Sequence, residues 1–144
     1  MLRQCSKQQG VSRLKEISAV DFQHTVKELL SRNKSILDLI TKFQDSNARV
    51  NRAIVKAVTQ CGCIRINAEK QVVPENADFS QLKEAMKTHL EGHLCENCMD
   101  IIEREIGKNL FYLVALCDTL DMDFYDIIIK EDQRVNLLGN YNLR

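Results

Sequence analysis

The fold is decided by residues 82–120, which read LKEAMKTHLEGHLCENCMDIIEREIGKNLFYLVALCDTL. Over most of this stretch, apolar side chains recur every three or four residues, which is the spacing of one face of an α-helix. These side chains are Leu82, Met86, Leu90, Cys98, Ile102, Ile106, Leu110, Leu113, Cys117 and Leu120. Asp78, with Gln81 three residues later, supplies a capping box just before them. The pattern predicts one long helix from Asp78 to Leu120, with Gly92 and Gly107 as the two places where it would bend.

A second helical pattern precedes this one and runs from Val26 to Ala57. Its heptad-like positions are Val26, Leu29, Asn33, Ile36, Ile40, Phe43, Asn47, Val50, Ile54 and Ala57. This spacing is typical of a helix that presents one face to a partner. The polar run from Asp45 to Asn47 leaves open whether the stretch is one helix or is capped anew and split into a hairpin. The spacing also leaves open whether the face packs within one chain or against a second copy.

The rest of the chain offers weaker signals. Residues 1–18 carry charge and little apolar content, which is typical of a flexible lead-in. Residues 64–73 favour an extended connection that ends before Pro74, and Asp123 is placed to cap a last short helix through about Val135. Residues 136–144 form a tail. The fold class that we expect is therefore all-α, with residues 1–144 forming one helical domain built as a bundle of long antiparallel helices.

Composition excludes several classes of protein. The chain has 144 residues, and its 20 Lys and Arg balance its 20 Asp and Glu, which argues against a nucleic-acid binder that relies on bulk electrostatics. No run of apolar residues is long enough to span a membrane. The N-terminal 18 residues lack the apolar core of a secretory signal, so we expect a cytoplasmic protein. In that compartment six cysteines indicate thiols or metal ligands rather than disulfides.

The cysteines supply the first candidate site. Cys61 and Cys63 form one pair, and Cys95 and Cys98 form another with helical spacing. Four thiolates satisfy the tetrahedral preference of zinc, or hold an iron–sulfur cluster. A redox pair and simple packing as small apolar side chains are the alternatives.

Two further candidates lie near the second cysteine pair. His89 and His93 are four residues apart, a spacing that lets both face one ion on a helix, and His93 is also placed to replace a missing thiolate ligand. Glu96, Asp100 and Glu103 form an acidic stripe, with Glu91 and Glu105 nearby on the same expected helix. Such carboxylates bind Mg²⁺ when they converge in a bundle, whereas a single acidic stripe is more often a solvated helix face.

One segment resembles a known family. Residues 103–124 read EREIGKNLFYLVALCDTLDMDF, and they resemble the second half of proteins of the all-α MazG-type nucleoside triphosphate pyrophosphohydrolase superfamily. The resemblance covers residues 103–135. It implies a homo-oligomeric helical protein that cleaves nucleoside triphosphates with Mg²⁺. Glu103 and Glu105 would then be catalytic, and Lys108, Lys130 and Arg134 would bind the phosphates of the nucleotide.

The sequence departs from the family at its acidic motifs. Where the family has a second acidic ligand, this chain has Lys108, and the counterpart of the first motif, residues 60–64, has Gln and Cys in place of acids. Mg²⁺ needs hard oxygen ligands, whereas cysteines favour a softer metal. Two hypotheses follow. One is a divergent or degenerate pyrophosphohydrolase, and the other is a non-enzymatic module that binds zinc or an iron–sulfur cluster.

Overall fold

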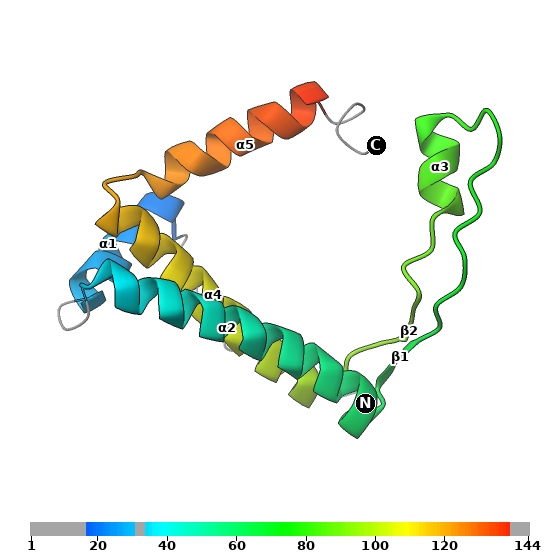
Figure 1. Ribbon diagram of the computed structural model, residues 1–144, viewed down its shortest axis with the longest axis horizontal. Helices are drawn as coiled ribbons and strands as arrows, with labels where there is room; N and C mark the ends of the chain where they lie inside the picture. Colours follow the sequence, from blue (N-terminus) through cyan, green and yellow to red (C-terminus); the bar gives the residue numbers. More distant parts are fainter. Residues whose placement is uncertain (1–16, 31–33, 139–144) are drawn as a thin grey trace, which may run out of the picture.

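The structure is a computed structural model, and it describes residues 17–30 and 34–138. This part of the chain is mostly helical, with one small antiparallel sheet (Figure 1). In chain order its elements are α1 (Ala19–Leu29), α2 (Ile36–Lys56), the π-helical turn η2 (Ala57–Cys61), β1 (Ile64–Ile66), α3 (Phe79–Ala85), β2 (Leu90–Gly92), α4 (Glu96–Thr119) and α5 (Phe124–Leu138).

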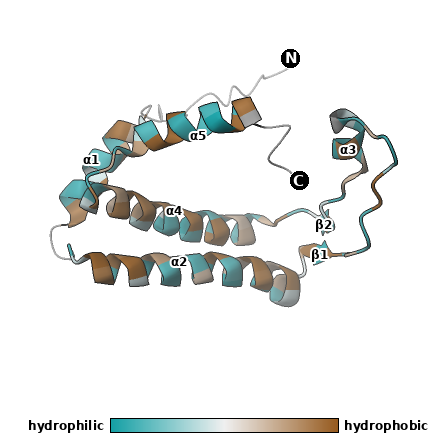
Figure 2. Ribbon diagram, turned by 45° about the horizontal axis from the view of Figure 1, so that its top comes forward, coloured by the Kyte–Doolittle hydropathy of each residue, from teal (hydrophilic) through white to brown (hydrophobic). Residues whose placement is uncertain are grey.

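The long helices α2 and α4 lie side by side and run in opposite directions (Figures 1 and 2). Between them the chain leaves as an arm, formed by β1, a long connection, α3 and β2, and it projects away from the helix pair. At the other end of the pair, α1 packs against α4, and α5 leaves α4 at an angle. The arm and the terminal helices are therefore at opposite ends of one helix pair.

Two separate apolar clusters hold this arrangement together. The first joins α1, α2 and α4 and consists of Val26, Leu30, Leu39, Val114 and Ala115. The second lies at the arm end and consists of Ala53, Ala57, Ile64, Cys98 and Ile102. Between them Ser46 of α2, which is 2% exposed, accepts a hydrogen bond of 3.1 Å from the side chain of Asn109 on α4. Three of the five residues in the second cluster are alanine or cysteine, so the arm end has the smaller core side chains.

The long helix predicted from Asp78 to Leu120 is wrong as a single element. The capping box of Asp78 and Gln81 is present, but α3 ends at Ala85 and α4 begins only at Glu96. Between them His89 and Gly92 have positive φ, which no α-helix accommodates, and residues 90–92 pair with β1. Cross-strand pairing thus overrides the helical spacing of the apolar residues.

The helical stretch predicted from Val26 to Ala57 is not a single helix, because α1 ends at Leu29 and α2 begins at Ile36. The break does not lie at residues 45–47, which α2 runs through. Ser46 does not cap a helix, because its hydroxyl donates to the Phe43 carbonyl and meets Asn109. The buried face of α2 consists of Leu39, Ser46 and Ala53, and it is displaced by about one residue from the predicted heptad positions. Ile40 and Ile54 of that pattern are 50% and 40% exposed.

The chain ends follow the expectations in part. Ser18 caps α1 in a capping box with Asp21, and residues 1–16 of the predicted lead-in lie outside the described residues. The carboxylate of Asp123 accepts from the amide of Asp126 at the start of α5, as predicted, and α5 extends to Leu138. Residues 139–144 of the predicted tail also lie outside the description. No helix in the described part has the length and apolar content needed to cross a bilayer.

Candidate metal centre

Cys61 and Cys63 are placed by the end of the α2–η2 helix. The last turn is π-helical, with the amide of Gly62 donating to the carbonyl of Ala57 at 2.9 Å. Gly62 then adopts a left-handed conformation with φ +73°, which ends the helix and turns the chain into β1. Cys61 is the last helical residue, and Cys63 lies just before the strand. The turn therefore places both at the same end of the helix pair.

Cys95 and Cys98 are placed by the return of the arm. β2 pairs with β1 so that Gly92 lies opposite Ile64, next to Cys63. Cys95 is the N-cap residue of α4, and Cys98 lies in the first helical turn. The short sheet therefore carries the second cysteine pair back to the first, over a separation of more than thirty residues.

The four cysteine sulfurs form one group, and all of them lie within 4.8 Å of one another. The Sγ atoms of Cys61 and Cys95 are 3.7 Å apart, much farther than the roughly 2.05 Å of a disulfide. A zinc ion with Zn–S bonds of about 2.3 Å holds tetrahedral sulfurs about 3.8 Å apart. The described cysteines are all free thiols. The group thus has the ligand type, number and spacing of a single tetrahedral metal ion.

The site combines exposed and buried sulfur. Cys61 is exposed, Cys63 and Cys95 are half-buried, and Cys98 is buried. The backbone amide of Cys98, together with the neighbouring thiols, lowers the pKa of Cys95 to about 7. Burial and the neighbouring thiols raise the pKa of Cys98 to about 12. Without a cation these sulfurs cannot all ionise at neutral pH, and a divalent cation replaces their protons.

The other predicted metal ligands near this group lie outside it. His93, Glu96 and Asp100 are exposed, and among the residues that the structure describes only the four cysteines form a group of metal-ligating side chains. His89 and His93 do not share a helix face, because they flank β2. The ring of His89 instead contacts the segment of the arm that follows β1. There the amide of Glu69 donates to its Nδ1 at 3.1 Å.

The residues predicted for nucleotide hydrolysis lie on α4 and α5. Glu103 is exposed on α4, and Glu105 is half-buried beside Lys108, whose amine lies 2.7 Å from Oε1 of Glu105. On α5, Lys130 is exposed and Arg134 pairs with Glu131 of its own helix. These groups therefore come from two helices, and within the described part of the chain only Glu105 and Lys108 among them are in contact with one another.

The hairpin that assembles the cysteines was not predicted from the sequence pattern. The signal for it in the sequence was Gly92, three residues before Cys95, but the helical pattern on both sides obscured it. No family model, curated protein or solved structure matches this chain. The geometry of the cysteine group therefore carries the functional argument.

Proposed function

We propose that Cys61, Cys63, Cys95 and Cys98 bind one zinc ion and that the protein is a zinc-stabilised helical interaction module. The observation that carries the proposal is the approach of all four sulfurs to within 4.8 Å of one another. Zinc sites with four protein ligands are structural, because catalytic sites keep a position open for water. In an iron–sulfur cluster the four thiolates are shared among two or four irons, which needs a wider cage than a single ion does.

The ion would act as a clip between three elements. It would join the end of η2, the base of the arm and the start of α4, next to a cluster that contains only small and medium side chains. A reducing compartment such as the cytoplasm would keep the thiols available for metal. The site's contribution is therefore to stability and to the position of the arm.

The test is metal content and thermal stability of the full chain purified without chelator. We expect about one zinc per chain, and we expect Cys98→Ser to lose the metal and to lower the Tm. Cys117→Ser is the matched control, because Cys117 is also buried but lies in the other half of α4. Full metal content in Cys98→Ser would contradict the proposal. An iron signal in place of zinc would overturn the choice of metal.

Nucleotide pyrophosphohydrolysis stays the prediction of the family resemblance. Its catalytic residues Glu103 and Glu105 have no additional carboxylate ligands grouped around them in the described part of one chain. The test is pyrophosphate release from nucleoside triphosphates with Mg²⁺ or Mn²⁺. Pyrophosphate release by the wild type that disappears in Glu103→Gln would support this function. If the wild type releases no pyrophosphate, the zinc module remains the proposed function.

We also propose that two copies associate through a face of the α2–α4 pair, which would complete a helical bundle. On α4, Met99, Ile106, Leu110 and Leu113 form a stripe in which each side chain is between 37% and 49% exposed. Ile40 and Ile54 of α2 lie on the flank of the pair next to that stripe. The arrangement supports the homo-oligomer expected from the heptad-like spacing.

Helix length favours a second copy as the occupant of this face. With a rise of 1.5 Å per residue, the 21 residues of α2 and 24 of α4 give lengths of about 31 and 36 Å. The 11 residues of α1 and 15 of α5 give only about 16 and 22 Å. Among the described elements, only another α2–α4 pair matches the face along its whole length.

A further inference from the structure

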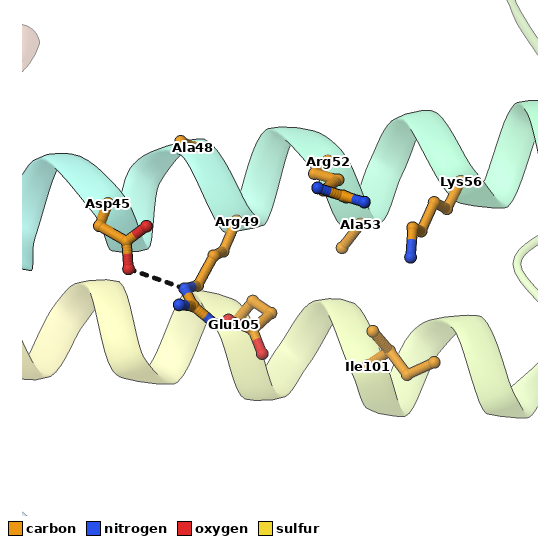
Figure 3. A pocket seen from close by; sticks show the side chains of 8 residues that line it. All are labelled: Asp45, Ala48, Arg49, Arg52, Ala53, Lys56, Ile101 and Glu105. Atoms are coloured by element: carbon orange, nitrogen blue, oxygen red, sulfur yellow. Dashed lines mark hydrogen bonds and ion pairs between the residues drawn. The ribbon is translucent and has the colours of Figure 1, made fainter.

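The opposite flank of the α2–α4 pair is basic and hollow. A groove of about 430 Å³ runs between the helices, lined on the α2 side by Arg49, Arg52 and Lys56 and on the α4 side by Ile101 and Glu105 (Figure 3). Its α2 wall also contains Ala48 and Ala53, whose small side chains leave the space open. A second hollow of about 330 Å³ shares Ala53, Lys56 and Ile101 and continues the groove towards Cys61.

The groove has three cations but only two carboxylates, Asp45 and Glu105. Arg49 is paired with Asp45 at 2.8 Å, but Arg52 and Lys56 have no ion pair or hydrogen bond within the described residues. The three cations, at positions 49, 52 and 56, follow one another at intervals of three and four along α2, where like charges repel. On α4 the acid of the lining, Glu105, lies towards Arg49, and the other lining residue is Ile101 (Figure 3). The lining thus keeps an excess of one positive charge in a concave place, which is a feature of ligand sites.

The two ends of the groove offer different hydrogen-bonding groups. Towards the cysteines the lining contains the amide side chains of Gln60 and Asn97, both of which can donate. At the other end, Oε2 of Glu105 is buried and has no hydrogen-bond partner among the described residues. A buried carboxylate oxygen without a partner is costly, and a donor from a ligand would satisfy it. The groove therefore suits a ligand with an oxyanion and a hydroxyl or amino group.

We propose that this groove binds a phosphate monoester of a small hydroxyl-bearing molecule. Arg52 and Lys56 hold the phosphate, because guanidinium and ammonium groups provide charge-assisted hydrogen bonds to phosphate oxygens. The remainder of the ligand lies along the alanine side of α2, and one of its hydroxyls donates to Glu105. The site lies on the flank away from the proposed dimer face and does not depend on the zinc proposal.

Lys56 has a second role that the experiment must separate from binding. It lines the hollow that includes Cys61 and Cys98, so its charge also offsets the negative charge of the thiolates. Arg52 lines the groove but not that hollow. Arg52→Gln is therefore the informative variant, and Arg65→Gln, an exposed arginine on β1, is its matched control.

The experiment titrates the full chain, purified without chelator, with inorganic phosphate and with glucose 6-phosphate. Amide chemical shifts follow the binding at constant ionic strength in chloride. We expect saturable shifts in residues 48–57, binding of the ester at least tenfold tighter than that of inorganic phosphate, and at least tenfold weaker binding in Arg52→Gln with unchanged zinc content. Arg65→Gln should bind like the wild type. Linear, unsaturable shifts, equal affinity for the two probes, or equal loss in both variants would overturn the proposal.

Discussion

Gly92 shows how a single residue position supports the cysteine group. Its φ is +84°, and a Cβ placed there would lie 2.6 Å from the carbonyl oxygen of Cys63, a backbone atom that cannot move aside cheaply. Gly107, in the middle of α4, has nothing within 4 Å of an added Cβ. Position 92 therefore requires glycine, whereas position 107 has room for a larger side chain. In the sequence both glycines interrupt the same apolar pattern.

Gly92→Ala should destabilise the zinc-loaded protein by about 2 kcal/mol or more, because a left-handed backbone and a steric clash both oppose the new methyl group. Gly107→Ala should stabilise it by about 0.5 to 1 kcal/mol, since alanine is the better helix former. Urea denaturation measures both values. Equal effects of the two substitutions would contradict the role given to Gly92.

The cysteines should also differ in reactivity in the metal-free, reduced protein. Because the pKa of Cys95 is lowered to about 7, its thiolate predominates above that pH and not only above the ordinary value of 9. The rate of alkylation at Cys95 should rise with pH and reach half of its maximum near pH 7. Cys98, whose pKa is raised to about 12, should react last.

Peptide mapping by mass spectrometry after timed iodoacetamide treatment follows each cysteine separately. Circular dichroism on the same sample shows that the metal-free chain is still helical. Equal rates at Cys95 and Cys98 in the helical protein would contradict the assignment.

At the scale of elements, the arm depends on a small base. β1 and β2 have three residues each, and the cluster beneath them contains Ala53, Ala57 and Ile64. A two-stranded sheet of this size is marginal by itself in water. Further out, the arm is supported by side chains on its own surface, such as Gln71, which bonds to both the amide and the carbonyl of Lys87.

Removing metal with a chelator should therefore loosen the arm end selectively. We expect faster amide hydrogen exchange in residues 61–66 and 90–98, because the proposed metal clip between η2, the sheet and α4 would be lost. Residues 111–117, which pack against α1 at the other end, serve as the internal control. Uniform exchange changes, or none, would show that the metal does not hold the arm.

At the scale of the whole molecule, the α2–α4 pair has two unlike flanks. One carries the exposed apolar stripe of α4, and the other carries the basic groove. Ile106 and Ile101 belong to these two flanks and are 49% and 40% exposed on the same helix. They make a matched pair for testing which flank meets a second copy.

Ile106→Glu should convert a dimer into a monomer, because a buried unpaired carboxylate is unfavourable at an interface, whereas Ile101→Glu should remain dimeric. Light scattering coupled to size-exclusion chromatography gives the mass of each variant, and circular dichroism monitors folding. Ile54→Glu provides the same test from α2. A monomeric wild type at high micromolar concentration would contradict the dimer.

The sequence by itself determined the helical class, the caps at Asp78 and Asp123, and the identity of the four cysteines, because these depend on local spacing and on residue chemistry. Only the tertiary structure decided where the helices end around Gly92 and that the cysteine pairs meet. A sequence pattern records periodicity along one element, and the positive φ of Gly92 becomes necessary only when β2 lies beside Cys63.

The burial of α2 shows the same division. The heptad-like spacing predicted an apolar face, but it did not distinguish the side that contacts α4 from the side that stays exposed. Ser46 lies on the contacting side because Asn109 supplies its hydrogen-bond partner, while Ile40 and Ile54 remain exposed. Which of two neighbouring helix faces is buried depends on the partner's side chains, and these are fixed only when the two helices pack together.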